Sequence, residues 1–392
     1  MIRSVDADQR TRRRRRREVV RRRRVRLLVA ALVAFVVGVV VGAGGDDAPD
    51  SRQKPATEPA AEQARKAAAA VDKLSLEQQV GRMVILRFNG TAPPGYVRRV
   101  LREGRAAGVI LFRDNVVSPD QMRRLTRTLR EAMPGAIVSA DQEGGEVQTL
   151  SWAGPEGSAP DQQAAGSVRT DAEESARLLA YAGVNVTLAP VADVPSVDGA
   201  ALAGRSFSSD PETAAAAVKD AITGWHAGGV ATTVKHFPGL GGATVNTDDG
   251  TATIKRSRTE MEADLEPFKA GIAAGTEFVM AGHAIYPAYD GLHIASQSPA
   301  IIAGLLRRDL GFKGVVMTDS LEAAAVQAVA GVEESAVASA EAGVDVILTT
   351  GRGSYIRVYR ALLERARQDR GFRARVRSSA ARVLAAQSSR DG

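Results

Sequence analysis

Val315–Ala324, with the sequence VVMTDSLEAA, is the stretch that decides the fold. Its first four residues form a short apolar run rich in β-branched side chains, which is typical of a strand buried in a parallel sheet. Asp319 follows this run directly, and the helix-prone segment Leu321–Ala330 can close a βα unit behind it. The carboxylate of Asp319 is therefore expected at the open carboxyl end of the sheet. Helix capping by Asp319 or Ser320 would explain the same pattern.

Seven other short apolar runs have the same strand character: Met83–Phe88, Val109–Phe112, Ala136–Ala140, Val184–Leu188, Ala231–Val234, Phe278–Met280 and Val344–Leu348. Stretches with a helical pattern lie between them: Ser118–Met133, Ala172–Ala182, Pro211–Ala227, Thr259–Ala274, Ala300–Leu310 and Val332–Ala342. Eight strands in regular alternation with helices predict an α/β fold, a single (β/α)8 TIM-type barrel over residues 71–388. This length is somewhat above the roughly 250 residues usual for that fold.

Several of the predicted strands end in polar residues: Asp141, Asp193, Lys235 with His236, His283 and Asp319. Because the carboxyl ends of barrel strands meet at one rim, these side chains are expected to lie together. Burying charged groups is costly unless they are paired or bind a ligand. The pattern therefore predicts a binding or catalytic site at this rim.

Seven motifs occur in the order found in glycoside hydrolase family 3, which the chain resembles. They are GVILFRDNVVSPDQ (108–121), SADQEGGEVQ (139–148), APVADV (189–194), RSFSSDPE (205–212), KHFPG (235–239), GHAIYP (282–287) and LLRRDLGFKGVVMTDSLEA (305–323). The resemblance spans roughly Leu74 to Thr350 and is greatest to single-domain bacterial β-N-acetylglucosaminidases that act on peptidoglycan fragments.

The resemblance implies roles for five residues. Asp319 matches the nucleophile, which in this family forms a covalent glycosyl-enzyme. Asp141, Arg205, Lys235 and His236 match the residues that hold the sugar. Independently of the family, a carboxylate can accept hydrogen bonds from sugar hydroxyls, and Lys, Arg and His can donate them. A histidine at a strand end can also be purely structural, and ligand contact is the favoured interpretation of His236.

The sequence departs from the family pattern after KHFPG. The family usually has His-Gly-x-x-x-x-Asp-Ser-His there, and its last His, paired with the Asp, is the general acid/base. Counted from Lys235, this chain has Asn246 at the Asp position and Asp248 at the His position. Two arginines that follow Glu-Gly-Gly in the family are also replaced, by Glu146 and Thr149. The usual contacts of those arginines are therefore in question.

Three interpretations of this loop compete. Asp248 or Asp249 is the acid/base, since a carboxylic acid with a raised pKa does this work in most glycosidases. Alternatively, the loop is a turn without chemistry, and the enzyme needs an activated leaving group. In the third interpretation catalysis is lost and the chain is a sugar-binding module. The first is favoured, because Asp319 and the whole sugar-holding set are retained.

The formal net charge of +7 comes from one end of the chain. Residues 1–26 hold thirteen arginines against three carboxylates, so the remainder carries a net charge of −3. A nucleic-acid-binding protein would need its basic residues gathered on the folded surface. No nucleic-acid partner is therefore expected.

The basic segment 1–26 is followed by nineteen residues without a charge, 27–45, and then by Asp46 and Asp47. This order is typical of a transmembrane helix with a cytoplasmic basic flank, which predicts a membrane anchor and an extracytoplasmic barrel. A cleaved signal peptide with secretion is the alternative, because Val-Gly-Ala-Gly-Gly resembles a cleavage site. Residues 46–70 are predicted to form a flexible or partly helical linker.

The chain has no cysteine, so disulfides and lipoprotein attachment are excluded. Its glycine clusters fit turns better than phosphate-binding loops, and its four histidines lack metal-ligand spacing, so neither a cofactor nor a metal is expected. His283 is expected to line the site or support it. The resemblance implies a retaining glycosidase that releases a terminal β-linked N-acetylglucosamine or related sugar from a cell-wall glycan. A non-catalytic glycan-binding protein on the same barrel is the alternative.

Overall fold

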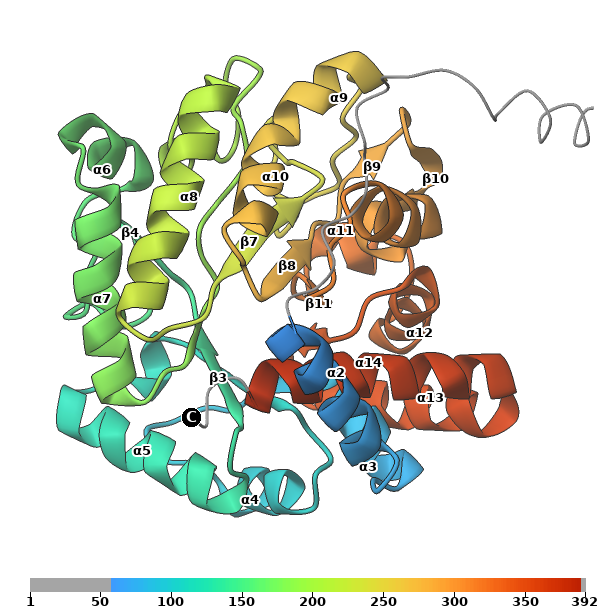
Figure 1. Ribbon diagram of the computed structural model, residues 1–392. Helices are drawn as coiled ribbons and strands as arrows, with labels where there is room; N and C mark the ends of the chain where they lie inside the picture. Colours follow the sequence, from blue (N-terminus) through green and yellow to red (C-terminus); the bar gives the residue numbers. More distant parts are fainter. Residues whose placement is uncertain (1–57, 389–392) are drawn as a thin grey trace, which may run out of the picture. The chain divides into compact units, whose positions relative to one another are not determined.

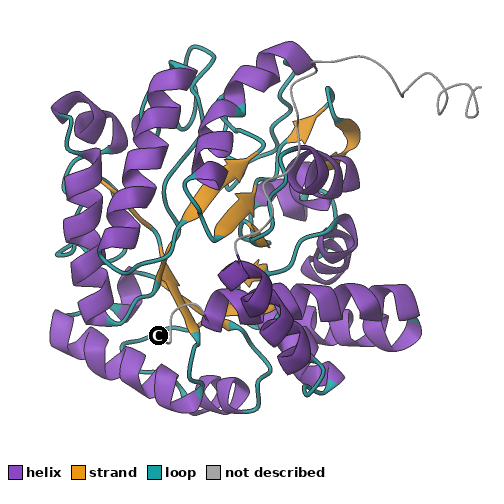
Figure 2. Cartoon of the chain, in the orientation of Figure 1, coloured by secondary structure: helices purple, strands orange, loops and turns teal. Residues whose placement is uncertain are grey.

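The computed structural model describes residues 58–388, which form a closed barrel of eight parallel strands (Figures 1 and 2). The strands are β1 (Val84–Arg87), β2 (Gly108–Leu111), β3 (Ile137–Ala140), β6 (Val186–Thr187), β7 (Thr233–Phe237), β8 (Phe278–Ala281), β11 (Val315–Thr318) and β12 (Ile347–Thr349). They pair in the orders β12-β1-β2-β3-β6 and β11-β8-β7. Parallel bridges join the two sheets, Val186 with Ala231 on one side and Met317 with Val346 on the other. The predicted (β/α)8 barrel is confirmed.

Helices surround the strands (Figure 2). They are α2 (Glu58–Val71), α3 (Leu76–Gly81), α4 (Gly95–Arg102), α5 (Pro119–Ala132), α6 (Ala159–Ala165), α7 (Val168–Ala182), α8 (Pro211–Ala227), α9 (Arg258–Asp264), α10 (Glu266–Ala273), α11 (Ala324–Gln327), α12 (Val332–Ala342), α13 (Ser354–Gln368) and α14 (Arg370–Ser388), with a π-helical segment, η4 (Ala300–Asp309). Several helices begin where the sequence offers a cap. Ser118 accepts a hydrogen bond from Gln121 N at the start of α5, and Asp210 accepts one from Thr213 N at the start of α8.

Two predicted helices differ from the structure. The stretch Thr259–Ala274 is divided at Leu265 into α9 and α10, because Pro267 cannot donate to a helical ladder and therefore lies in the first turn of a new helix. Leu321–Ala330 contains only the four-residue α11, and its N-cap residue is Ala323. Capping by Asp319 or Ser320 is therefore the wrong explanation of their position.

The barrel has an apolar interior and an apolar outer layer. Alternate strand residues point inward and pair across the sheet, as Ile85 does with Leu348 and Met280 with Met317. Their chain neighbours, such as Leu86, pack outward beneath the helices. Strands buried on both faces need nearly continuous apolar sequence, which is the pattern from which the sequence predicted them.

Helix α14 covers the amino end of the barrel. Gln387 Nε2 donates to Ala107 O over 3.0 Å, and Ser379 Oγ lies 2.9 Å from Asp345 Oδ1. Ala107 and Asp345 stand just before β2 and β12, and Val383 packs with the interior cluster. The opposite rim is left for a ligand.

Helix α2 lies against α14 (Figure 1). The guanidinium of Arg377 and the carboxylate of Asp72 add a two-bond ion pair at 2.7 and 2.8 Å. Of the predicted linker 46–70, the part from Glu58 onward is therefore helical and packed against the barrel.

Within residues 58–388, no helix is both long and apolar enough to cross a bilayer. The basic segment 1–26 and the predicted spanning segment 27–45 lie outside the residues that the structure describes. The membrane anchor stays a prediction.

Candidate active site

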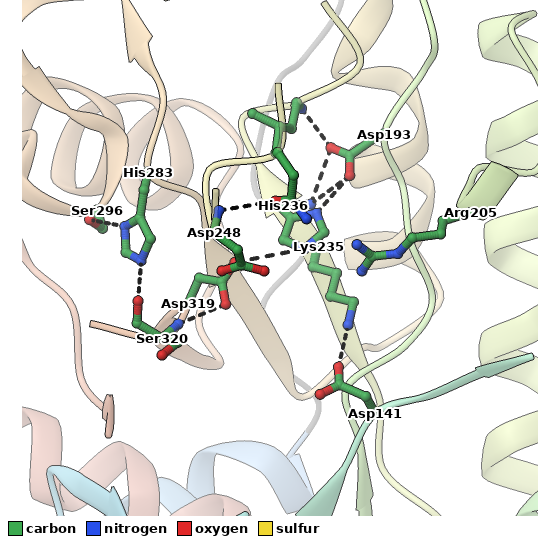
Figure 3. A network of polar contacts seen from close by, with 12 residues as sticks. Asp141, Asp193, Arg205, Lys235, His236, Asp248, His283, Ser296, Asp319 and Ser320 are labelled. Carbon is green, nitrogen blue, oxygen red and sulfur yellow. Dashed lines mark hydrogen bonds and ion pairs between the residues drawn. The ribbon is translucent and has the colours of Figure 1, made fainter. Parts of the chain in front are cut away.

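A cavity of about 650 Å³ lies at the carboxyl ends of the strands. Every site residue predicted from the sequence contributes to its lining: Asp141, Arg205, Lys235, His236, Asp248 and Asp319. They come from the ends of β3, β7 and β11, from the loop between β7 and α9, and, for Arg205, from a short 3-10 helix, η2 (Ala203–Arg205), between β6 and α8 (Figure 3). The barrel thus brings together residues that are up to 178 positions apart, counted from Asp141 to Asp319.

A network of four charges lies at one wall of the cavity; Asp141, Arg205 and Lys235 form part of the lining, and Glu143 does not. Lys235 Nζ lies 2.6 Å from Asp141 Oδ1 and 2.6 Å from Glu143 Oε1. Glu143 also receives two hydrogen bonds from the guanidinium of Arg205, at 2.7 and 2.8 Å. Lys235 is 2% exposed, so its charge depends on these two carboxylates.

The charges in this network fix one another's ionisation. Burial alone would raise the pKa of Glu143, but the positive charges of Lys235 and Arg205 hold it at about 2. Burial would lower the pKa of Lys235, but Asp141 and Glu143 raise it above its usual value. Glu143 and Lys235 therefore carry their charges at neutral pH, and Lys235 can donate to a bound hydroxyl without first gaining a proton.

Glu143 was not singled out in the sequence. It lies in β4 (Gln142–Gly144), beyond the end of β3, and is 8% exposed. Its position in the sequence could have indicated it. Glu143 lies two residues after Asp141, and a carboxylate buried there would need a cation as its partner.

His236 is oriented by a second carboxylate, that of Asp193. His236 Nδ1 lies 2.7 Å from Asp193 Oδ2, and because a carboxylate only accepts, Nδ1 carries the proton. Asp193 is itself held by the backbone N–H of Leu240, which donates to Oδ1 over 2.6 Å. His236 Nε2 is left facing Asp319 Oδ2 at 3.8 Å.

Asp319 stands directly after β11, with 18% of its side chain exposed to the cavity. The backbone N–H of Ser320 donates to its Oδ1 over 2.7 Å. Burial would raise the pKa of Asp319, but the nearby imidazoles of His236 and His283 and this N–H lower it below the usual value. Asp319 is therefore an ionised carboxylate that is partly open to a ligand.

His283 supports the site from behind. Its Nδ1 lies 2.9 Å from Ser296 Oγ and its Nε2 lies 3.0 Å from Ser320 O (Figure 3). It is fully buried, and this burial lowers its pKa. Of the two roles expected for His283, the structure shows the supporting one, since this residue holds the backbone next to Asp319.

The loop between β7 and α9 carries Asp248 into the cavity. Backbone bonds join this loop to α11, from Ala324 N to Asp248 O and from Ala325 N to Thr247 O, both at 3.1 Å. Burial and then the negative charge of Asp319 raise the pKa of Asp248 above its usual value. Asp249 does not contribute to the lining of this cavity. Of the two neighbouring carboxylates, Asp248 is the one placed to hold a proton there.

Two arginines that the sequence did not single out also line the cavity, Arg87 and Arg113. Arg113 donates from Nε to Gln148 O over 2.9 Å and from Nη2 to Glu146 O. Arg87 stacks on the ring of Phe112, with 4.4 Å between the guanidinium carbon and the ring centroid. They bring positive charge to the rim, where Glu146 and Thr149 stand in place of the arginines expected from the resemblance.

The site combines an ionised carboxylate, a second carboxyl group with a raised pKa, and a fixed set of charged donors and acceptors. This combination suits cleavage of a bond flanked by hydroxyl groups, because one carboxyl group can attack while the other supplies a proton. Among residues 58–388, no three His, Asp or Glu side chains are grouped so that they could hold a metal ion.

Comparison with known proteins identifies similar sequences and structures. Residues 75–386 match the profile of the glycosyl hydrolase family 3 N-terminal domain. A β-hexosaminidase of Stenotrophomonas maltophilia strain R551-3 is 37% identical over 280 residues, which cover 68% of this chain and 82% of that protein.

Two solved structures resemble the barrel closely. The β-N-acetylhexosaminidase of Beutenbergia cavernae DSM 12333 has a TM-score of 0.72 at 34% identity, and the match covers 81% of this chain and 99% of that chain. A family 3 β-N-acetylglucosaminidase from Paenibacillus sp. FPU-7 has a TM-score of 0.75 at 32% identity, and the match covers 81% of this chain and 64% of that chain.

Proposed function

The chain belongs to glycosyl hydrolase family 3 and is a glycosidase, and we propose that it releases a terminal β-linked N-acetylglucosamine or related sugar from a cell-wall glycan. The β-hexosaminidase and β-N-acetylglucosaminidase relatives support this choice of sugar. The proposed mechanism is retaining and uses only side chains and water.

The proposed mechanism rests on one observation. Two carboxyl groups in the same cavity have pKa values shifted in opposite directions from their usual values. The pKa of Asp319 is lowered, so this residue attacks the anomeric carbon as an anion and forms a glycosyl-enzyme. The pKa of Asp248 is raised, so this residue protonates the departing oxygen. Asp248 then takes a proton from the water that releases the sugar.

The charged wall of the cavity has the proposed task of holding the sugar. The carboxylate of Asp141 accepts from hydroxyl groups, while Lys235, Arg205 and His236 donate to others. Because these charges are already paired with one another, they keep their positions before the substrate enters. Fixed donors of this kind need little reorganisation when the transition state forms.

The test is hydrolysis by the purified full-length protein of a panel of nitrophenyl β-glycosides, beside chitobiose and a muropeptide. Release of nitrophenol from the N-acetylglucosaminide above all other sugars, together with cleavage of at least one natural substrate, is the expected result. Cleavage of nitrophenyl substrates alone would remove Asp248 as a working acid. Binding of chitobiose without any cleavage would show a glycan-binding protein instead.

The proposed location follows from residues 1–45. The arginine segment 1–26 and the uncharged segment 27–45 support a membrane anchor with the barrel outside the cytoplasm, near the wall glycan. Secretion after signal cleavage is the competing proposal.

A further inference from the structure

A small cavity of about 190 Å³ lies at the amino ends of β11 and β12, whereas the catalytic cavity lies at the carboxyl ends of the strands. Its lining includes no carboxylate and four cationic side chains, those of Arg307, Lys313, Arg375 and Arg382. The first belongs to η4, the second to the segment before β11, and the last two to α14. Cations from three separate segments of the chain therefore surround one small space.

The three arginines share one carboxylate, that of Asp345, whose side chain is fully buried. Its Oδ1 accepts from Arg375 Nη2 over 2.9 Å and from Arg382 Nη1 over 3.1 Å, and its Oδ2 accepts from Arg307 Nη2. Each oxygen also accepts one further hydrogen bond, from a serine hydroxyl or from a backbone N–H. Because a carboxylate has roughly four lone-pair positions, Asp345 has no capacity to satisfy the arginines further.

The charges around this cavity do not balance. Three arginines against one carboxylate leave a net charge of +2, and the exposed Lys313 adds another positive charge. Helices α12 and η4 end beside the cavity, and their two C-termini together offset about one charge. Within residues 58–388, none of the four cations forms an ion pair with a carboxylate other than Asp345. An excess of roughly two positive charges remains there.

The arginines repel one another. Burial lowers the pKa of Arg307 to about 10; the charge of Asp345 opposes this fall, and the charges of Arg382 and Arg375 add to it. The pKa of Arg375 is likewise lowered by burial and by Arg382, against the opposing effect of Asp345. A bound anion would relieve this repulsion and restore the hydration that burial removes.

The same arginines have hydrogen-bond donors left over. Within residues 58–388, the side chain of Arg382 makes one hydrogen bond, to Asp345, although a guanidinium has five N–H donors. Arg375 donates from Nε and Nη2 to backbone carbonyls at the end of α12 and to Asp345, and its Nη1 makes no hydrogen bond within that range. The two side chains are 31% and 22% exposed, so a small anion can reach them from solvent.

We propose that this cavity binds a phosphate dianion, either inorganic phosphate or a phosphate monoester. Arginine forms charge-assisted, often bidentate hydrogen bonds with phosphate, and lysine adds a compact positive charge. A phosphate monoester carries about 1.5 to 2 negative charges at neutral pH, which matches the excess, whereas a carboxylate or a phosphodiester carries one. The site is separate from the glycosidase cavity, so its ligand does not compete with the sugar.

Titration calorimetry of the full-length protein at about pH 8, where phosphate is a dianion, tests the inference. The probes are inorganic phosphate, sn-glycerol 3-phosphate, the diester glycerophosphoglycerol and acetate, all at the same ionic strength. Inorganic phosphate or the monoester is expected to bind about tenfold or more tightly than the diester and acetate, the size of one additional hydrogen bond between charged groups. Added sodium chloride should weaken this binding.

Two variants assign the binding to this cavity. Arg382→Gln should weaken phosphate binding about tenfold, and its matched control is Arg370→Gln, which removes an exposed arginine of α14 outside the cavity lining. Lys313→Gln should also weaken binding while leaving the unfolding temperature nearly unchanged, because this lysine is exposed. It decides the test if Arg382→Gln does not fold. Its control is Lys219→Gln, which removes an exposed lysine of α8.

The possible results separate clearly. A loss of phosphate affinity in Arg382→Gln or Lys313→Gln that is absent from the controls supports the inference, and the tighter of the two dianions identifies the ligand as free phosphate or a monoester. The inference is overturned if acetate or the diester binds as tightly as phosphate, if no probe binds, or if both variants bind phosphate like wild type. Competitive inhibition of glycoside hydrolysis by phosphate would also overturn it, since the anion would then occupy the catalytic cavity.

Discussion

The network of charges beside the cavity depends on Glu143. Its carboxylate is shared between Lys235 and Arg205, and neither cation has another partner that could replace it fully. Removing one member of a buried ion network leaves an uncompensated charge. The stability of the barrel is therefore tied to Lys235 and Arg205, which are proposed to hold the sugar.

Glu143→Gln is expected to lower the free energy of unfolding by roughly 3–5 kcal/mol at neutral pH, measured by urea denaturation. Because the folded pKa of Glu143 is about 2 against an ordinary value of 4.5, its stabilising contribution is present above pH 4.5. That contribution is lost as the pH falls toward 2, so the difference between wild type and variant should shrink over this range. The exposed Glu146→Gln is the control. If the difference in unfolding free energy between wild type and Glu143→Gln did not change with pH, ionisation of Glu143 would be ruled out as the cause of that difference.

Asp319→Asn is expected to slow turnover about a thousandfold or more while leaving the thermal unfolding temperature nearly unchanged. A neutral amide cannot form the glycosyl-enzyme, and the amide has nearly the same shape as the carboxylate. Activity and circular dichroism on the same preparation check both parts. Activity within tenfold of wild type would exclude Asp319 as the nucleophile.

Asp248→Ala is expected to slow hydrolysis of natural sugars by about 100-fold or more, because their leaving groups need a proton. The first step on nitrophenyl substrates should survive, since those groups depart unaided. Added azide should then restore the second step and give a glycosyl azide of retained configuration. Asp249→Ala should behave like wild type, because its side chain lies outside the cavity lining. If both variants keep full activity on natural substrates, proton transfer comes from another group.

At the scale of elements, the loop between β7 and α9 carries the proposed acid and is joined by backbone hydrogen bonds to α11, the helix after the strand that ends at the proposed nucleophile. Gly241 in this loop packs against the segment that follows β6, and an added Cβ would be 1.8 Å from Val194 O. Gly241→Ala must therefore move the loop, and we expect a loss of about 1–3 kcal/mol in unfolding free energy and a larger effect on kcat than on KM. Gly204→Ala is the control, because its Cβ would meet no atom within 4 Å. Unchanged kinetics in Gly241→Ala would mean that the loop position does not matter for catalysis.

The elements differed in how well the sequence predicted them. All eight strands were predicted, because a strand buried on both faces needs a continuous apolar run. Helices α8 and α12 were predicted to the residue, whereas Leu321–Ala330 was not. Its first N–H groups bond the loop at Asp248 and Thr247, a distant contact that local helix propensity cannot reveal.

The site residues, like the helices and strands, were predicted only in part from the sequence. Strand-end positions and motifs found Asp141, Lys235, His236 and Asp319, because the barrel topology fixes where strand ends meet. Glu143, Arg87 and Arg113 were missed, because their positions depend on contacts with other segments of the chain, which include backbone carbonyls as well as side chains.

At the scale of the whole molecule, one prediction concerns the proposed membrane anchor in segment 27–45. The full-length chain is expected to sediment with membranes, and a chain beginning near Asp46 is expected to stay in the supernatant, because only the former retains the uncharged segment 27–45. Fractionation and blotting check this expectation. Recovery of the native protein in soluble form, beginning between Ala43 and Asp50, would favour a cleaved signal peptide.

The shared carboxylate of Glu143 also limits how this enzyme can evolve. Lys235, Arg205 and Glu143 depend on one another's charge, so single substitutions among them are penalised and change requires coordinated replacements. The loop that carries Asp248 is held to α11 through the backbone carbonyl oxygens of Thr247 and Asp248, which accept from N–H groups of α11 and are present in every residue type. If Asp248 is the proton donor, as proposed, a lineage can exchange it in one mutational step while the proposed sugar contacts stay dependent on one another. In this architecture, pH optimum and leaving-group preference can diverge before the sugar that is recognised does.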